Sequence, residues 1–110
     1  MRSGFLAFQF ERLVQGRDAT RTLALDSEVA RLVLTRHGNV VSCVCLLHEP
    51  TAEGLEALRR RGAVDGTFMI TPNLCARDFG VWLDRLLTDD LGADPRSDVR
   101  VLEAVPAALF

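Results

Sequence analysis

The chain has 110 residues, of which 48% are hydrophobic and 25% are charged, a composition typical of a single globular domain over residues 1–110. The formal charge of −2 and the isoelectric point near 5.6 give no overall basic field that would hold a polyanion. All 13 basic residues are arginine, which excludes Schiff-base chemistry and phosphate loops that depend on lysine.

No apolar run approaches the roughly 18 residues that a membrane-crossing helix needs, and the first residues lack the apolar core of a secretory signal. We therefore expect a cytoplasmic protein without membrane contact. The three cysteines are an odd number without the spacing of a disulfide framework, so we expect free thiols in a reducing compartment. Nothing in the sequence indicates a cofactor.

The segment from Phe5 to Val14 has apolar residues at helical spacing, which favours an amphipathic helix that ends at Gly16. A strand that uses Leu6, Phe8 and Phe10 alternately is the competing interpretation. Residues 15–18 have the composition of a turn, and residues 20–25 are rich enough in threonine and leucine to predict a strand.

Residues 27–38 allow two interpretations. Ser27 could cap a helix that Gly38 closes, or residues 31–36 could form a strand joined by a tight turn to residues 40–47. The hairpin is favoured because Leu32 to Leu34 would face Val40 and Val41 across a turn of suitable length. Residues 40–47 are apolar at successive positions, which predicts a central strand covered on both faces.

The next helix is predicted from Thr51, as its N-cap, to Arg61, with Leu55 and Leu58 facing inward and Gly62 just beyond its end. Glu56 and Arg60 have the spacing of an intrahelical ion pair. A strand over residues 64–71 should follow and end before Pro72.

Asn73 is predicted to cap the longest helix, which ends at Gly92 and whose apolar face comprises Cys75, Phe79, Trp82, Leu83 and Leu86. A polar loop over residues 94–98 and a last strand over residues 99–105 complete the chain. Strands that alternate with helices imply some parallel pairing. The predicted fold is therefore α/β, with a central mixed sheet of about four to five strands flanked by about three helices.

Cys43 and Cys45 lie two residues apart within the apolar strand, where both would point to the same face. Zinc sites generally combine Cys-x2-Cys pairs, and only Cys75 and two histidines remain as further ligands, so packing in the core is favoured over a metal site. A reactive thiol would need a polar, electropositive setting that the neighbouring residues do not indicate.

His48 closes a strand directly before a helix, a position where α/β folds often place functional groups, whereas His37 falls in a turn and should be solvated. No nucleophile elbow, dinucleotide fingerprint or phosphate loop occurs, and no catalytic residue is assigned. A small enzyme with a site around His48, Glu49 and Cys45 is kept as an alternative.

Arginines form one basic cluster, and guanidinium groups suit phosphate oxygens. A nucleic-acid contact would use these four residues: Arg59, Arg60, Arg61 and Arg77. The simpler interpretation is a favourable set of cations at a helix C-terminus.

The C-terminal segment 104–110 is apolar to its last residue, with Val105, Leu109 and Phe110 as its largest side chains. Such a segment either folds back on the core or docks on a partner. Both outcomes remain open at this stage.

Residues 8–14 on a first helix, a β-meander, and Asp65 to Pro72 leading into a further helix resemble a Mrr-type restriction-endonuclease-like domain of the PD-(D/E)xK class over residues 7–87. In that family an acidic residue on one strand and a Gln/Glu-x-Lys pair on the next bind magnesium. The resemblance places this pair near Cys43 and Cys45, and the nearest candidate acid, Asp26, lacks companions. It thus implies a nuclease-like fold that has lost its catalytic site.

The leading functional hypothesis is a non-enzymatic interaction module that binds a protein partner or associates with itself, for example as a dimer. Val105, Leu109 and Phe110 are the candidate contact residues. Nucleic-acid binding through the arginine cluster is the alternative from another class.

Overall fold

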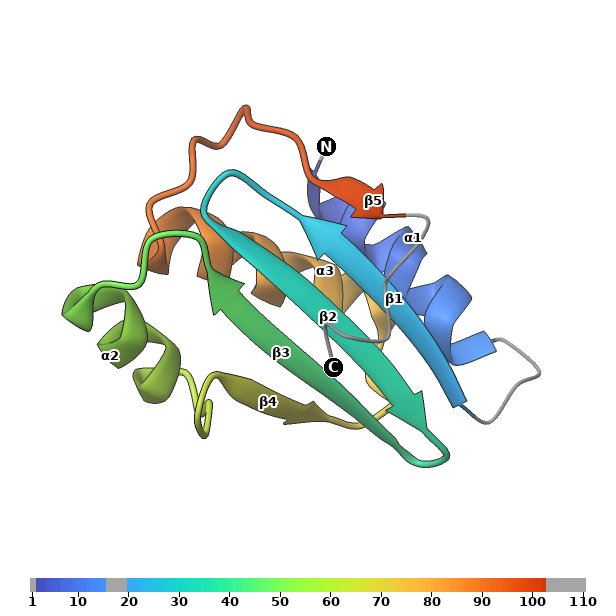
Figure 1. Ribbon diagram of the computed structural model, residues 1–110. Coiled ribbons are helices and arrows are strands. Elements are labelled where there is room, and N and C mark those ends of the chain that lie inside the picture. The colour runs from blue at the N-terminus through green and yellow to red at the C-terminus, as the bar shows by residue number, and fades with distance from the viewer. Residues whose placement is uncertain (1, 16–19, 103–110) are drawn as a thin grey trace.

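The structure is a computed structural model that describes residues 2–15 and 20–102, with the Thr20 side chain left out. The described elements follow one another as α1 (Arg2–Gln15), β1 (Thr20–Asp26), β2 (Ala30–His37), β3 (Val40–Leu47), α2 (Ala52–Arg60), β4 (Thr67–Ile70), α3 (Ala76–Arg85), η1 (Leu86–Asp90) and β5 (Arg100–Leu102). The α/β class, the five strands and the flanking helices confirm the prediction from sequence (Figure 1).

The sheet has the strand order β4-β3-β2-β1-β5, and every pair of neighbouring strands is antiparallel. The expectation of a mixed sheet was therefore wrong. The connection through α2 joins β3 to its neighbour β4, which runs antiparallel to it. The connection through α3 joins β4 to β5 at the opposite edge, where β5 runs antiparallel to β1. Alternation of helices and strands alone does not distinguish these connections from parallel crossovers.

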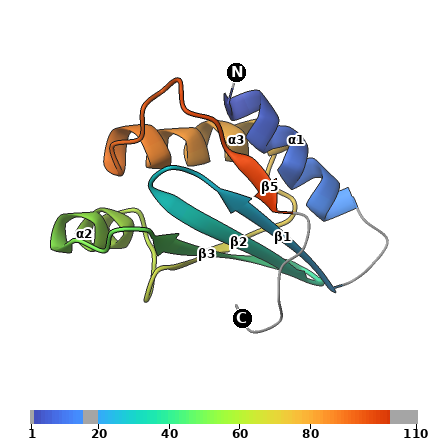
Figure 2. The ribbon, with the colours of Figure 1, turned by 45° about the horizontal axis from the view of Figure 1, so that its top comes forward.

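The helices α1 and α3 cover the same face of the sheet, and no described helix covers the other face (Figure 2). The core lies between these layers and includes Leu6 and Phe10 from α1, Phe79 and Leu83 from α3, and Leu32 from β2. In β3 the odd-numbered Val41, Cys43 and Cys45 are buried, and the even-numbered Val40 and Leu46 are exposed. The expectation that β3 is covered on both faces was wrong, because an antiparallel sheet can leave one face open.

The hairpin of β2 and β3 confirms the favoured interpretation of residues 27–38, and the helix is excluded. All eight residues of β2 pair with β3, and Gly38 turns the chain with a φ of +56°. The first helix also forms as expected, with Leu6, Phe10 and Leu13 buried along one face. The turn expected at residues 15–18 and the end of the strand expected at residues 99–105 fall partly outside the described residues.

Two predicted elements have different bounds. The strand expected from residue 64 is shortened to Thr67–Ile70, because Asp65 and Gly66 both have positive φ and form a two-residue turn between Val64 and Thr67. Cys75, not Asn73, occupies the N-cap of α3, and α3 continues into the π-helical turn η1. The apolar face predicted for this helix is nevertheless buried, with Phe79, Leu83 and Leu86 fully enclosed.

The helices α1 and α3 approach each other closely at Gly80. A Cβ atom on Gly80 would lie 2.2 Å from the Ser3 carbonyl oxygen and 2.9 Å from the Ala7 nitrogen. Next to this contact, the rings of Phe10 and Phe79 stack with their centroids 4.2 Å apart. Only glycine therefore allows the two helix backbones to reach this separation.

We expect Gly80→Ala to destabilise the protein by about 2 to 3 kcal/mol, because the new methyl group overlaps backbone atoms that cannot move independently. The matched control is Gly4→Ala in α1, where a Cβ atom would meet nothing within 4 Å. Since alanine favours helix, that change should be neutral or stabilising by up to about 1 kcal/mol. Urea unfolding of the two variants measures the difference, and equal stabilities would contradict the close approach.

Candidate functional site

The helix α2 lies at one end of the sheet with an open depression on each side of it. Thr51 caps the helix by accepting a hydrogen bond from the Gly54 nitrogen at 3.0 Å, as predicted from sequence. The buried residues Ala57 and Leu58 attach α2 to the rest of the protein. Its remaining side chains are divided between the two depressions.

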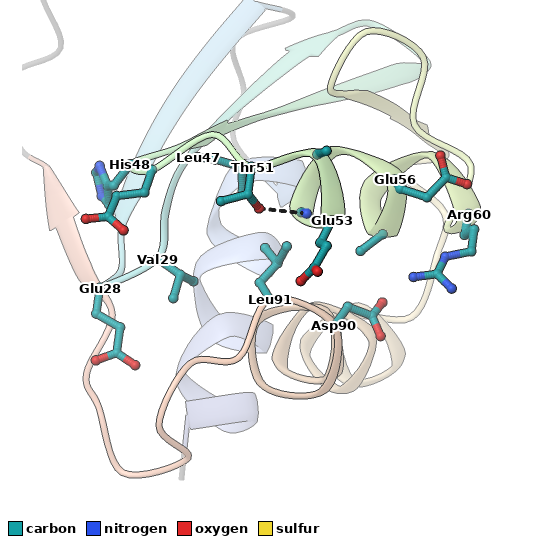
Figure 3. A pocket seen from close by; sticks show the side chains of 14 residues that line it. Glu28, Val29, Leu47, His48, Thr51, Glu53, Glu56, Arg60, Asp90 and Leu91 are labelled. Atoms are coloured by element: carbon teal, nitrogen blue, oxygen red, sulfur yellow. Dashed lines mark hydrogen bonds between the residues drawn. The ribbon is translucent and has the colours of Figure 1, made fainter.

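The first depression is a cavity of about 840 Å³ between α2, η1 and the β1–β2 connection (Figure 3). Glu53, Glu56 and Arg60 face it from α2, at the i, i+3, i+7 spacing that places residues on one side of a helix. The opposite wall contains Glu28 and Val29 from the β1–β2 connection and Asp90 and Leu91 from the end of η1. Figure 3 shows Glu53 extending toward Leu91.

This cavity is acidic. Its lining includes five carboxylates and one arginine, and His48 stands at the end near Glu28. Asp90 is paired with Arg61, whereas Glu53 has no ion-pair partner in the described part of the chain. The cavity therefore presents an excess of negative charge to solvent and suits a cationic ligand.

The second depression is an apolar groove of about 480 Å³ between α2, the end of β3 and the turn before β4. Its lining comes mainly from Leu46, Leu55 and Leu58, with Pro50 and Ala63 beside them. Leu55 was expected to face inward but is 53% exposed, because the core side of α2 is occupied by Ala57 and Leu58. Val64, next to the groove in the chain, is 73% exposed.

The residues around His48 do not form a catalytic group with Cys45. His48 Nε2 lies 3.0 Å from Asp26 Oδ1 and 3.0 Å from the Ser27 carbonyl oxygen, so this nitrogen carries the proton and donates it to two acceptors. His48 and Glu49 line the acidic cavity, but Cys45 lines the apolar groove on the other side of α2. The three residues considered for an enzyme site are thus divided between two depressions.

Asp26 is the centre of a small ion-pair cluster. Its carboxylate is 3.0 Å from His48 Nε2, 3.7 Å from Arg31 Nε and 3.3 Å from an Arg100 guanidinium nitrogen. Two arginines and His48 surround the acid that the nuclease resemblance would place in a magnesium site, and no second described carboxylate pairs with it there. In residues 2–15 and 20–102, no three His, Cys, Asp or Glu side chains are grouped so that they could hold a metal ion.

The four arginines considered for nucleic-acid binding are not brought together. Arg59 pairs with Glu56, Arg61 pairs with Asp90, and Arg60 faces the acidic cavity. The pairing of Glu56 with Arg59 replaces the pair with Arg60 that was expected. Arg77 lies in the first turn of α3, roughly 20 Å along the helix from Asp90, so it is distant from the other three.

Cys43 and Cys45 are buried on the helix-covered face of β3, which confirms their interpretation as core residues. Burial raises the pKa of Cys45 from 9.0 to about 11. The pKa of Cys43 is raised further, first by burial and second by the charge of Cys45. Both are therefore protonated and unreactive at neutral pH, and Cys75 is the exposed cysteine.

His37 is exposed at the end of β2, as expected. The candidate contact residues Val105, Leu109 and Phe110 lie outside the described residues. No described helix has the length and apolar character that a membrane crossing requires. Comparisons of the chain with known protein families, curated proteins and solved structures found no match.

Because Cys43 and Cys45 are buried, the free energy of unfolding should decrease at alkaline pH. The unfolded chain loses these protons near pH 9, whereas the folded chain retains them to higher pH, so we expect the free energy of unfolding to fall above about pH 9 by up to ~1.4 kcal/mol per pH unit for each thiol. The chain contains no lysine or tyrosine, so no other side-chain type interferes in this range. Urea unfolding at increasing pH measures this decline.

The control for the thiol prediction is Cys75→Ser, which should keep the full pH dependence because Cys75 is exposed. Replacing both Cys43 and Cys45 by alanine should lower stability at pH 7 and remove most of the alkaline decline. An unchanged decline in this double variant would contradict the assignment to buried thiols.

For the Asp26 cluster, we expect Asp26→Asn to lower the free energy of unfolding by about 1 to 2 kcal/mol, because two guanidinium groups and the His48 N–H lose a largely buried carboxylate. Asp98→Asn makes the same chemical change at an exposed position and should have little effect. Equal effects of the two changes in urea unfolding would show that the cluster adds nothing.

Proposed function

We propose that this protein is a non-enzymatic interaction module that binds a basic, amphipathic segment of another protein at α2. The observation that carries this proposal is Leu55, which is more than half exposed at an apolar groove although it lies on an otherwise well-formed amphipathic helix. Exposed apolar side chains gathered in a concave surface commonly mark protein-binding sites.

The chemistry of the two depressions supports the kind of partner. The exposed Leu46 and Leu55 in the groove suit the leucine-like side chains of a helical segment. The five carboxylates of the cavity on the other side of α2 suit arginine or lysine side chains from the same partner. A segment that carries both kinds of side chain would therefore be favoured over an acidic or purely apolar one.

Three further hypotheses from the sequence concern self-association, nucleic-acid binding and a nuclease-like origin. Self-association would use the exposed Leu46 and Leu55, and nucleic-acid binding would use Arg59, Arg60, Arg61 and Arg77. A nuclease-like origin of the fold, without the magnesium-binding acids, is compatible with an interaction module but is not required by it.

The test uses two synthetic helical peptides with leucines on one face and either arginines or glutamates on the other. We expect the arginine peptide to bind and the glutamate peptide to bind at least about tenfold more weakly, because the cavity attracts only the cationic face. Binding of the arginine peptide should weaken as salt is added. Fluorescence anisotropy of labelled peptide measures both effects.

Leu55→Ser should weaken binding of the arginine peptide by about tenfold, equivalent to about 1.4 kcal/mol. Val81→Ser changes an exposed apolar side chain on α3, outside both depressions, and should leave the affinity unchanged. Equal binding of the two peptides, or no effect of Leu55→Ser, would refute the site. Sedimentation of the protein alone identifies self-association, which Leu55→Ser would abolish if the groove contacts a second copy.

A further inference from the structure

Two arginines flank one carboxylate on the face of the sheet that carries no described helix. The register of β1 places Asp26 opposite Arg31 of β2 on one side and opposite Arg100 of β5 on the other. Directly opposite residues of an antiparallel sheet point to the same face, with their Cβ atoms about 5 Å apart. Leu25 and Leu32, the chain neighbours of Asp26 and Arg31, belong to the core, so the three charged side chains point away from α1 and α3 (Figure 2).

This row of three side chains carries more positive than negative charge. Both guanidinium groups are always ionised, whereas Asp26 supplies a single opposing charge. Among the ion pairs of the described residues, Arg31 and Arg100 have Asp26 as their shared partner and no second carboxylate. His48 donates a further hydrogen bond to Asp26 from Nε2 and adds no negative charge. The row therefore attracts anions.

The hydrogen-bond donors of the two guanidinium groups are largely unused within the described part of the chain. A guanidinium group has five N–H donors, and Arg100 donates one hydrogen bond to Asp26 Oδ2 at 3.3 Å. Arg31 Nε lies 3.7 Å from Asp26 Oδ1, which is too far for a hydrogen bond, and this buried donor has no acceptor among the described residues. A buried donor without an acceptor is costly, so an anion with several oxygens would be stabilised here.

The two arginines are more accessible than the carboxylate between them. The side chains of Arg31 and Arg100 are 32% and 77% exposed, whereas that of Asp26 is 14% exposed. A ligand that approaches this face therefore meets the guanidinium groups first. Strands β2 and β5 lie about 10 Å apart on either side of β1, and both side chains extend toward β1 to reach Asp26. One anionic group above Asp26 is thus within reach of both arginines.

We propose that Arg31 and Arg100 bind a phosphate monoester group on this face of the sheet. The planar donor forks of arginine match phosphate oxygens, and a monoester at neutral pH carries nearly two negative charges on three acceptor oxygens. A carboxylate offers one charge and two oxygens, so it binds less well. Arg31, Asp26 and Arg100 line neither depression beside α2, so this inference is independent of the function proposed above.

The test is a titration of the isotope-labelled full chain with inorganic phosphate, followed by NMR at constant ionic strength so that screening does not change. We expect the Nε–H signals of Arg31 and Arg100 to shift and to saturate. Acetate should bind at least about threefold more weakly, because it carries less charge. Equal affinities for the two anions would overturn the choice of phosphate, and signals that do not shift would overturn the site.

Arg100→Gln removes one of the two guanidinium groups at an exposed position, where the fold should tolerate the change. We expect it to weaken phosphate binding at least about fivefold, because one donor fork and one charge are lost. The matched control is Arg96→Gln on the loop before β5, which removes the same charge from a side chain that is 93% exposed and should leave the affinity unchanged. Equal weakening by both variants would indicate general attraction by charge and overturn the site.

Asp26→Asn distinguishes binding from stability. Asparagine keeps an oxygen that can accept from Arg100 but removes the negative charge beside the bound anion. We therefore expect the affinity for phosphate to rise at least about threefold, although the variant is less stable. An unchanged or lower affinity would overturn the proposal. Should this variant fail to fold, the comparison of Arg100→Gln with Arg96→Gln decides alone.

A phosphate monoester group can belong to a small molecule or to a phosphorylated side chain, and two probes distinguish these sources. Glycerol phosphate and a phosphoserine within a short peptide of neutral residues are titrated in the same way. Tighter binding of the peptide supports the proposal with a phosphorylated protein as the source, and equal or tighter binding of glycerol phosphate supports it with a small molecule. If neither probe shifts the signals of Arg31 and Arg100, the proposal is overturned.

Discussion

The contact between α1 and α3 holds the helical layer together, and two features of the sequence set its geometry. Gly80 lets the backbones approach to a distance that no side chain would allow, and Phe10 and Phe79 stack beside it. At the start of α1, the almost fully buried side chain of Arg2 donates hydrogen bonds to Asp84 of α3, to Thr88 of η1, and to Asp94 and Ser97 of the following loop. The two helices therefore cover the sheet as one rigid layer.

Periodicity in the sequence was sufficient to predict most elements, because burial on a single face imposes a repeat of 3.6 residues in α1 and α3 and pairing imposes a repeat of two in β2 and β3. It failed where the decision depended on contacts distant in sequence. Whether two strands are parallel or antiparallel depends on which strands pair in the sheet, and the sequence does not show this pairing. The apolar residues at even positions of β3 suggested a second helical layer, which the described residues do not contain. The turn at Asp65 and Gly66 was missed, although Asp-Gly between apolar residues is itself a strong turn signal in the sequence.

The residues of the candidate site were harder to predict from the sequence than the elements of the fold. The burial of Cys43 and Cys45 followed from their apolar context, but Leu55 was assigned to the core because its spacing from Leu58 fits an inward face. The exposure of Leu55 becomes clear only from the position of α2 at the end of the sheet. There the helix buries only Ala57 and Leu58, and the side chains on either side of them remain exposed. The acidic cavity combines residues from three segments, and its one sequence signal was the run of Glu49, Glu53 and Glu56.

The hydrogen bonds of Arg2 also constrain the order in which the chain can fold during synthesis. Its partners follow it by 82 to 95 positions, so α1 leaves the ribosome long before any of them exists. The pairing of β2 with β3 joins residues that are close in sequence and can form early, but α1 must wait for α3 and the subsequent loop to complete the core. Until then the apolar side of α1 stays exposed, which makes this protein a candidate for chaperone contact on its first helix while translation is in progress.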